Sequence, residues 1–324
     1  MPHAIRIHQT GGPEVLRWEE VDVPAPAAGE VTVRHAAVGL NYIDTYHRTG
    51  LYPLPLPSGI GLEGAGTVEA VGEGVSDLQV GDRVAYAGGP VGAYAEVRNL
   101  PAWRLMKLPE AIAFETGAAM MLQGLTSAYL LRKTFRVQAG DKVLIHAAAG
   151  GVGLIACQWA KALGATVIGT VGSPAKAELA KAHGCDHVIN YSTEDFPARV
   201  RELTGGDGVA VVYDCVGKDT FQGSLDCLRP RGMMVSYGNA SGPVPPVDLI
   251  QLSQKGSLFV TRPTLAHHTS TREEILELGG ELVAMIASGQ VRIEVNQRYA
   301  LKDAAQAHRD LEARKTTGST ILVP

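Results

Sequence analysis

The run from Ala147 to Gly153 (AAAGGVG) has the residue types and spacing of a phosphate-binding turn. It fits the pattern G-x-G-x-x-G, with Ala148 at the first glycine position and Gly150 and Gly153 at the other two. An apolar segment that reads as a short strand, 142–146, precedes it, and a stretch of helical composition follows. Free N–H groups at the start of such a helix bind pyrophosphate. The predicted contacts with a dinucleotide are Ala149, Gly150, Gly151 and Val152.

The end of the next predicted strand, 166–170, indicates which dinucleotide binds. Enzymes that use NAD usually carry Asp or Glu about 20 residues past the glycine motif, where it binds the ribose 2′-hydroxyl. Residues 169–176 contain no acid, and Gly172, Ser173 and Lys176 occupy this stretch. A hydroxyl and a cation suit a 2′-phosphate, so the sequence predicts NADPH. Tyr191, after the third predicted strand, either stacks on adenine or binds the phosphate, or is a partly buried structural tyrosine.

The ends of the later predicted strands should lie along the same carboxyl edge of the sheet and line the cofactor cleft. Gly217 and Gly238 either let the backbone approach the nicotinamide ribose or serve only as turn glycines. The predicted contacts in these segments are Val216, Gly217, Tyr237, Gly238, Asn239, Arg262, Pro263 and Thr264.

The elements that position these residues predict an α/β protein of two domains. Residues 30–38 alternate polar and apolar side chains, as a half-buried strand does, and Gly and Pro punctuate the first part of the chain. From residue 142 short apolar runs alternate with helical segments, which indicates a doubly wound parallel sheet. The last part, after Thr261, should fold back onto the β domain. The predicted domains are 1–124 with 263–324, and 125–262.

Composition limits the partners and the location. The chain has 324 residues, a formal net charge of −4 and a pI near 6.2, so nothing favours nucleic acid or an anionic membrane as a partner. The N-terminus has no signal-peptide pattern and no segment has the length of a membrane span. Four cysteines match no metal site and read as buried thiols. We expect a cytoplasmic protein.

Motifs along the whole chain carry a family resemblance. They include GGPEVL at 11–16, NYIDTY at 41–46, GLEGAG at 61–66, GDRV at 81–84 and the glycine-rich run itself. With these motifs the chain resembles the quinone oxidoreductase (zeta-crystallin-like) branch of the medium-chain dehydrogenases/reductases, and within it the bacterial NADPH:quinone reductases. The resemblance implies a GroES-like, mostly antiparallel β domain, a Rossmann domain and a homodimer. The apolar edge strand 257–261 is the predicted dimer contact, because an exposed edge needs cover.

The chain departs from its zinc-dependent relatives at their ligand positions. Those alcohol dehydrogenases carry Cys where this chain has Asn41, and G-H-E where it has Gly61-Leu62-Glu63. A catalytic zinc needs three protein ligands, and these positions supply neither the thiolate nor the imidazole. We therefore expect no metal.

The resemblance also implies site residues outside the nucleotide motifs. Asn41 and Thr126 would reach the nicotinamide end of the cofactor, with Tyr42 and Tyr129 nearby, and Arg314 would close over it. Tyr46 and Tyr52 would stack on the substrate or donate to it, or would only pack in the Pro-rich loop at 52–57. The predicted catalytic residues are Asn41, Tyr46, Tyr52 and Thr126.

These features predict metal-free hydride transfer from NADPH to a small quinone. A quinone accepts hydride readily, so orientation by the protein supplies much of the catalysis. One alternative is a zinc-free reductase of an enone or enoyl thioester. Another is a crystallin-like or RNA-binding role, which the acidic pI and the lack of a basic stripe disfavour.

Overall fold

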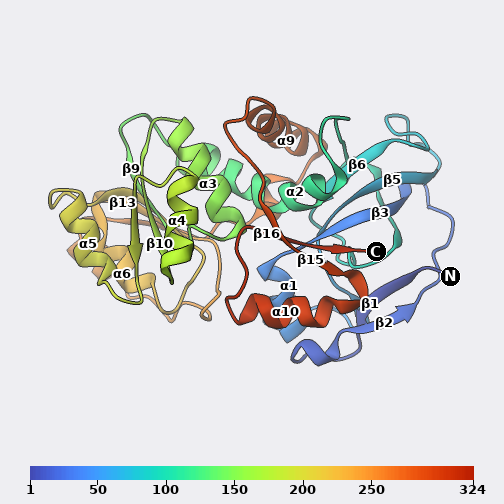
Figure 1. Ribbon diagram of the computed structural model, residues 1–324, viewed down its shortest axis with the longest axis horizontal. Coiled ribbons are helices and arrows are strands. Elements are labelled where there is room, and N and C mark those ends of the chain that lie inside the picture. Colours follow the sequence, from blue (N-terminus) through green and yellow to red (C-terminus); the bar gives the residue numbers. More distant parts are fainter. The chain divides into compact units, whose positions relative to one another are not determined.

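The computed structural model describes every residue, Met1–Pro324, and divides the chain into two compact units. Unit 1 comprises Met1–Leu125, Thr269–Gly280 and Ile293–Pro324. Unit 2 comprises Thr126–His268 and Glu281–Arg292. Each unit has its own sheet, and Figure 1 shows both.

Unit 1 is built on antiparallel strands. A seven-stranded sheet has the order β15-β16-β3-β5-β6-β8, with β7 paired to β3, and β1, β2 and β4 form a smaller sheet. Alternating apolar side chains of the long strand β3 enter the core beside those of β5 and β6, as the sequence period predicts. The strands are β1 (His3–Ile7), β2 (Arg17–Glu20), β3 (Glu30–Leu40), β4 (Ser58–Gly59), β5 (Glu63–Val71), β6 (Arg83–Ala87), β7 (Val97–Pro101), β8 (Met106–Lys107), β15 (Val295–Ala300) and β16 (Ser319–Val323).

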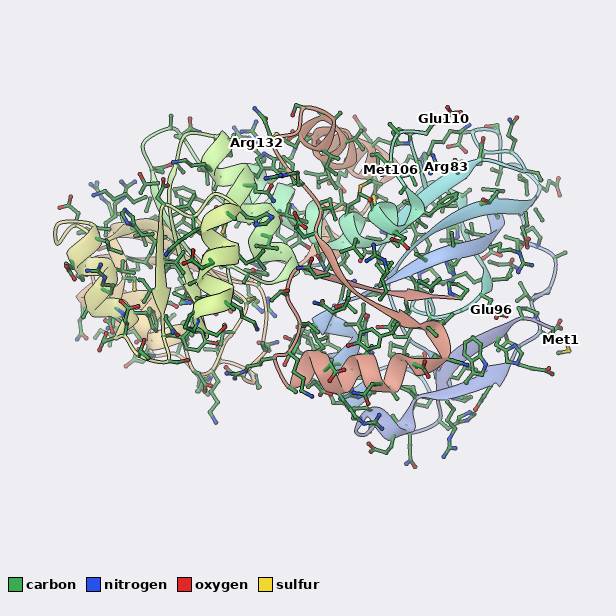
Figure 2. The ribbon with its side chains drawn as sticks, viewed as in Figure 1. Met1, Arg83, Glu96, Met106, Glu110 and Arg132 are labelled. Carbon is green, nitrogen blue, oxygen red and sulfur yellow. The ribbon has the colours of Figure 1, made fainter.

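The C-terminal strands complete this sheet, as predicted for the last part of the chain, whereas residues 262–268 and 281–292 belong to unit 2. Strand β16 pairs antiparallel with β3, with Ile321 opposite Gly39, and β15 runs parallel to β16. Met106 of β8 is labelled in Figure 2. It packs against Gly279, where any side chain would collide with the Met106 sulfur. The helices at this end of the chain are α9 (Arg272–Ala287) and α10 (Ala304–Glu312).

One helix of unit 1 was not predicted. Helix α1 (Tyr42–Thr49) directly follows β3, in a stretch where the sequence analysis names site residues but no helix. Asn41 is its N-cap and Gly50, with φ of 83°, ends it. The local signals are the Asn at the cap, Asp44 three residues later and the closing glycine, which together suit a short helix.

Unit 2 is a parallel sheet with the order β11-β10-β9-β12-β13-β14. Numbered from its own first strand this is 3-2-1-4-5-6, the order of a Rossmann fold, which confirms the predicted fold class. The strands are β9 (Lys142–Ile145), β10 (Thr166–Val171), β11 (His187–Asn190), β12 (Val209–Asp214), β13 (Leu228–Ser236) and β14 (Phe259–Thr261).

Helices link these strands. Helices α5 and α6 share a core with the sheet that includes Leu144, Val200, Val212, Phe221 and Leu225. The edge strand β14 is shorter than predicted and leaves Phe259 57% exposed. The helices are α2 (Phe114–Tyr129), α3 (Gly151–Ala162), α4 (Pro174–Ala182), α5 (Phe196–Leu203), α6 (Phe221–Asp226), α7 (Ile250–Gln254) and α8 (Leu265–His268). None of the helices in the chain is both long and apolar enough to span a bilayer.

Candidate active site

The glycine-rich run forms the turn between β9 and α3. Gly150 caps α3 with extended backbone, and the helix begins at Gly151. A side chain on Gly153 would collide with the carbonyl oxygen of Ala147, so this glycine permits close packing of the helix on the turn. The left-handed residue is Ala147, with φ of 50°, whereas Ala148, at the expected glycine position, is not left-handed. The free N–H groups at the start of α3 suit a pyrophosphate.

The end of β10 has the features expected for a 2′-phosphate. Ser173 caps α4 and its Oγ accepts a bond from the backbone N of Lys176 at 3.4 Å, which leaves the hydroxyl proton for a ligand. The hydroxyl of Tyr191 lies 2.5 Å from where a Cβ on Gly172 would be, so a side chain there would displace the tyrosine. Ser192, which sequence reasoning missed, donates to the carbonyl of Gly172 at 3.1 Å. No carboxylate follows β10 before α4 begins.

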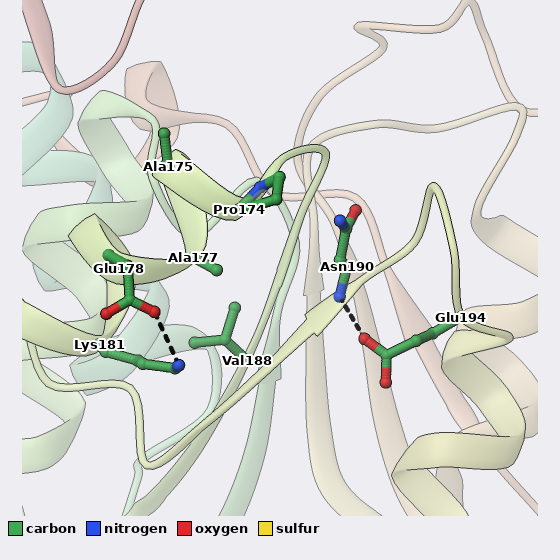
Figure 3. A pocket seen from close by; sticks show the side chains of 8 residues that line it. All are labelled: Pro174, Ala175, Ala177, Glu178, Lys181, Val188, Asn190 and Glu194. Atoms are coloured by element: carbon green, nitrogen blue, oxygen red, sulfur yellow. Dashed lines mark hydrogen bonds and ion pairs between the residues drawn. The ribbon is translucent and has the colours of Figure 1, made fainter.

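A shallow groove of about 470 Å³ lies beside this region, between α4 and the end of β11 (Figure 3). Glu178 and Lys181 form an ion pair on its α4 side, and Glu194 accepts from the backbone N of Asn190 opposite. Because Pro174 and Asn190 adjoin Ser173 and Tyr191 in sequence, the groove borders the adenosine end of the predicted site.

The turns after β12 and β13 are packed backbone to backbone. A Cβ on Gly217 would lie 2.6 Å from the carbonyl oxygen of Gly242, and one on Gly238 would collide with the carbonyl oxygen of Cys215. The backbone N of Ser241 also donates to the carbonyl of Val216 at 2.8 Å. Contacts within the protein therefore explain both glycines without a ligand.

A buried carboxylate that sequence reasoning missed holds the first of these turns. Oδ1 of Asp214 accepts from the backbone N of Val216 and of Gly217, at 2.8 and 3.0 Å. Its Oδ2 accepts from the hydroxyls of Thr220 and Ser224, at 2.7 and 2.9 Å.

His146, which ends the segment before the glycine-rich turn, joins this network. Its Nε2 lies 2.9 Å from the Ser224 hydroxyl and its Nδ1 lies 2.8 Å from the Thr170 hydroxyl. Burial lowers the pKa of His146. The network ties together the ends of β9, β10 and β12.

The remaining predicted contacts of unit 2 lie near these turns. Arg262 donates to the carbonyl of Ser236 at 3.0 Å, at the end of β13. Tyr129 is buried and stacks on His268, with ring centroids 4.5 Å apart, and burial raises its pKa. Thr126 is also buried. Tyr237, Asn239, Pro263 and Thr264 follow β13 and β14 at the carboxyl edge.

In unit 1, helix α1 gathers the predicted aromatic residues. The ring centroids of Tyr42 and Tyr46 are 5.6 Å apart, and those of Tyr46 and Tyr52 are 5.2 Å apart. His47 also packs edge-on against Tyr52. Tyr46 is buried, whereas Tyr42 and Tyr52 are partly exposed and better placed to meet a ligand. Arg314 lies in the exposed loop after α10, in left-handed conformation with φ of 58°.

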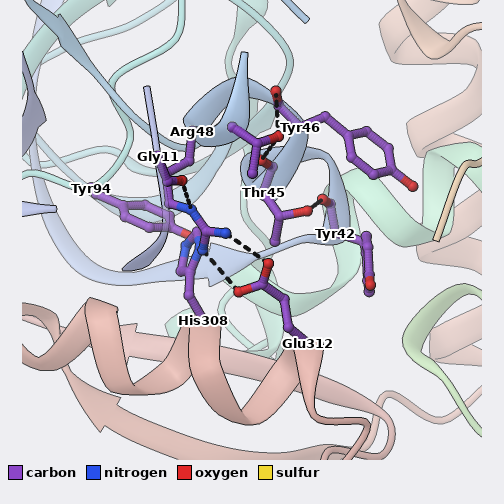
Figure 4. A network of polar contacts seen from close by, with 9 residues as sticks. Gly11, Tyr42, Thr45, Tyr46, Arg48, Tyr94, His308 and Glu312 are labelled. Carbon is purple, nitrogen blue, oxygen red and sulfur yellow. Dashed lines mark hydrogen bonds and ion pairs between the residues drawn. The ribbon is translucent and has the colours of Figure 1, made fainter. Parts of the chain in front are cut away.

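A buried polar network anchors α1 to α10 (Figure 4). The guanidinium of Arg48 forms two bonds to Glu312, at 2.7 and 3.0 Å, and donates to Nδ1 of His308 at 2.9 Å. Burial, with Arg48 adding to it, lowers the pKa of His308 to about 3, so the imidazole stays neutral. Tyr94 lies 3.2 Å from the other imidazole nitrogen and donates to Oδ2 of Asp44 at 2.8 Å.

Asp44 links that network to the start of α1. Its Oδ2 also accepts from the backbone N of Asn41 at 2.9 Å, and burial raises its pKa to about 7. Sequence reasoning missed Arg48 and His308, since no local pattern marks a contact between residues 260 positions apart. It also missed Asp44, although its place three residues after Asn41 is a local capping signal. The helix that carries three of the predicted site residues is thus held at both ends.

The zinc positions of the related alcohol dehydrogenases are filled by other groups. Leu62 is buried, and Asn41 bonds to Glu63. No group of three or more His, Cys, Asp or Glu side chains in the chain is arranged to hold a metal ion.

A domain of antiparallel strands, a Rossmann domain and a phosphate-binding turn define a medium-chain dehydrogenase/reductase. Residues 27–110 match the alcohol dehydrogenase GroES-like domain family, and residues 151–280 match the zinc-binding dehydrogenase family.

Relatives that match over their full length identify the family within this class. The chain is 57% identical to a quinone oxidoreductase of Pseudomonas aeruginosa, with all of both chains covered. A crystal structure of Escherichia coli quinone oxidoreductase complexed with NADPH matches with a TM-score of 0.98 at 54% identity, over 99% of this chain and 100% of that one. A 2-haloacrylate reductase of a Burkholderia species is 49% identical, over 100% of this chain and 99% of its own. The chain therefore belongs to the zinc-independent quinone oxidoreductase family.

Proposed function

We propose that this chain is an NADPH-dependent quinone oxidoreductase that transfers hydride to a small quinone without a metal. The main support for NADPH as the cofactor comes from the end of β10, where Ser173 caps α4 beside Lys176 and no carboxylate is present. The NADPH complex of the Escherichia coli relative supports the same choice, and the names of the relatives support the acceptor.

The proposed roles divide between a cofactor domain and a substrate domain. The start of α3 would hold the pyrophosphate, and Ser173, Lys176 and Tyr191 would hold the 2′-phosphate and adenine. The turns braced by Asp214 would hold the nicotinamide half. We assign 125–262 to this cofactor domain, and 1–124 with 263–324 to the substrate domain.

Bound NADPH supplies the hydride, and with a proton from water a quinone becomes the hydroquinone. The chain's own part is orientation. Asn41 and Thr126 would position the reacting end of the cofactor, while Tyr42 and Tyr52 would bind the acceptor. An O–H donor near the acceptor oxygen stabilises the charge that develops there. We also propose a homodimer through the edge strand β14 and a cytoplasmic location.

Steady-state turnover of a simple benzoquinone and of an enone, each with NADPH, tests the acceptor. The proposal predicts clearly faster turnover of the quinone. The identity to a 2-haloacrylate reductase makes an activated alkene the second candidate. Equal or faster turnover of the enone would replace the quinone assignment.

Substitution Lys176→Ala tests the cofactor. Loss of the cation should weaken NADPH binding roughly tenfold or more and leave NADH binding almost unchanged, since only NADPH carries the 2′-phosphate. Fluorescence titration with both dinucleotides measures this, with Lys181→Ala on the same helix as the matched control. An equal loss for both dinucleotides would show that Lys176 does not bind the phosphate.

A further inference from the structure

Glu63, at the start of β5, is a fully buried carboxyl that the proposed mechanism does not yet use. Its side chain is 0% exposed. Oε1 accepts from the backbone N of Leu122 at 2.8 Å, and the backbone N of Met121 also bonds to the carboxyl. Oε2 accepts from Nδ2 of Asn41 at 2.7 Å. One oxygen is thus held by helix α2 and the other by a proposed catalytic residue.

The protein leaves space for this carboxyl in a specific way. A Cβ on Gly39 of β3 would collide both with Oε2 of Glu63 and with the carbonyl oxygen of Ala118 in α2. The carboxyl therefore fills a gap between β3 and α2 that any larger residue at position 39 would close.

The contact continues beyond Asn41 as a chain of amides. Nε2 of Gln123 donates to Oδ1 of Asn41 at 3.2 Å, and the hydroxyl of Ser319 donates to Oε1 of Gln123 at 2.7 Å. Asn41, Gln123 and Ser319 are all buried. An amide presents a donor at one end and an acceptor at the other, so the direction of the first amide sets the direction of the second.

These amides have two possible directions, and the observed one also lets the Asn41 side chain accept from the backbone N of Asp44. An ionised carboxyl only accepts, so it requires the NH₂ of Asn41 to face it, as observed. A protonated Glu63 must carry its proton on Oε2, because Oε1 faces backbone donors. It would then donate to Oδ1 of Asn41, and both amides would turn over, with Ser319 accepting at the far end.

We propose that Glu63 is a positioning residue for the reaction, which sets the direction of the Asn41 amide through the chain Glu63–Asn41–Gln123–Ser319. The inference rests on the proposed function, in which Asn41 contacts the reacting end of the cofactor. The ionised form should be the faster one, because a carboxylate one amide away stabilises the positive charge that develops on the nicotinamide as hydride leaves.

The surroundings of Glu63 bring the pKa of its carboxyl into the pH range that an activity assay can cover. Burial raises the pKa of Glu63 to about 8, against the lowering effect of its three donors, and the carboxyl of Asp44 adds to the increase. The other titratable groups that interact with or adjoin it are Tyr86, Tyr94 and His35, and burial lowers the pKa of His35 to about 4. Helix α2 contributes backbone N–H groups alone.

Substitution Glu63→Gln separates positioning from a merely structural role. The donors of Met121 and Leu122 require the Gln oxygen on their side, so its NH₂ must face Asn41. The variant thus favours the reversed direction, in which the Asn41 side chain no longer accepts from the backbone N of Asp44, and it keeps the size of the side chain. Gln123→Glu favours the same reversed direction of the Asn41 amide, since a carboxylate at position 123 accepts from the Asn41 NH₂.

The test is kcat/KM for benzoquinone with NADPH between pH 6 and 9.5, on both variants and the wild type. Glu69→Gln, an exposed charge on the same strand that pairs with Arg34, is the matched control. We expect wild type and control to rise roughly tenfold through about pH 8, and Glu63→Gln to stay at the low-pH rate throughout. Gln123→Glu should shift the rise to higher pH.

The alternative outcomes are distinct. A Glu63→Gln profile that matches the wild type, in value and in shape, would overturn the positioning role. If that variant does not fold by circular dichroism, an unshifted profile of Gln123→Glu would overturn it instead. A wild type that does not oxidise NADPH with any quinone would refute the proposed function, which is a different failure.

Discussion

The two units each bury a carboxyl, Asp214 in unit 2 and Glu63 in unit 1, and hold them in different ways. The four donors to Asp214 come from residues at most ten positions further along the chain. Two of the donors to Glu63 come from Asn41 and Leu122, which are 22 and 59 positions away. One carboxylate braces a local turn, and the other joins β5, α1 and α2.

The carboxylate of Asp214 therefore belongs to a rigid part of the structure, and that of Glu63 to a part that can rearrange. At Asp214, two backbone N–H groups and two hydroxyls converge on a single turn, so the carboxylate fixes a backbone shape. At Glu63, a side-chain amide is the partner on one side, and that amide can turn over when the carboxyl gains a proton, with loss of its bond from the backbone N of Asp44. The nucleotide side of the proposed enzyme is therefore fixed by its backbone, while the side that carries Asn41 can respond to one proton.

The largest expected effect is at Asp214. Asp214→Ala removes the acceptor of two backbone N–H groups and of the buried Ser224 hydroxyl, and should cost about 3 kcal/mol or more of unfolding free energy. Asp214→Asn is the control: its oxygen can keep the two N–H groups while the hydroxyls accept from its NH₂, so most of the stability should be retained. Urea denaturation of both compares them. A small loss in the alanine variant would contradict the bracing role.

A smaller effect concerns the pH dependence of stability at Glu63. The pKa of the folded-state carboxyl is raised to about 8 from 4.5, so between these values the folded chain keeps a proton that the unfolded chain releases. Stability from this group is full below pH 4.5 and is lost as pH rises to 8, by up to about 1 kcal/mol per pH unit.

Glu63→Gln removes that loss. The unfolding free energy of the variant should therefore increase relative to that of the wild type as pH rises. Shifts at His35 and His308 are present in both proteins and cancel in the difference. Denaturation at pH 5, 6.5 and 8 gives the difference directly. Parallel curves for the two proteins would mean that Glu63 is already ionised at pH 5.

The smallest expected effect is at the glycine-rich turn. Ala147 has φ of 50°, a left-handed conformation that costs an alanine about 1 kcal/mol. Ala147→Gly relieves it, and should stabilise the chain by roughly 0.5 kcal/mol after the greater freedom of unfolded glycine is subtracted. Ala149→Gly, where φ is not positive, should instead destabilise. A thermal melt that ranks the two in the opposite order would show that the turn is not strained at residue 147.

Local sequence signals predicted much of this molecule. Short apolar runs bounded by Gly identified most strands of the Rossmann sheet, and β16 was predicted at its observed bounds, Ser319–Val323. The run at 147–153 identified the turn before α3. The left-handed conformation of Ala147, with φ of 50°, was not predicted, because the pattern is aligned by its glycines and not by its backbone angles.

What the sequence did not predict depends on long-range contacts. Helix α1 is only eight residues long and is held by Arg48, whose partner Glu312 is 264 positions away. Glu63 was considered only as part of a motif that lacks a zinc ligand. Its contacts with Asn41 and α2 arise from strand register and from the space left by Gly39, neither of which a single sequence displays.

The most direct test of the central claim is quinone reduction by protein from which all metal has been removed. After exhaustive chelation, with metal content checked by mass spectrometry, kcat/KM for a benzoquinone is measured with NADPH and with NADH. We predict full activity without metal and a clear preference for NADPH. Activity that disappears on chelation and returns with zinc, or an equal rate with NADH, would contradict the account.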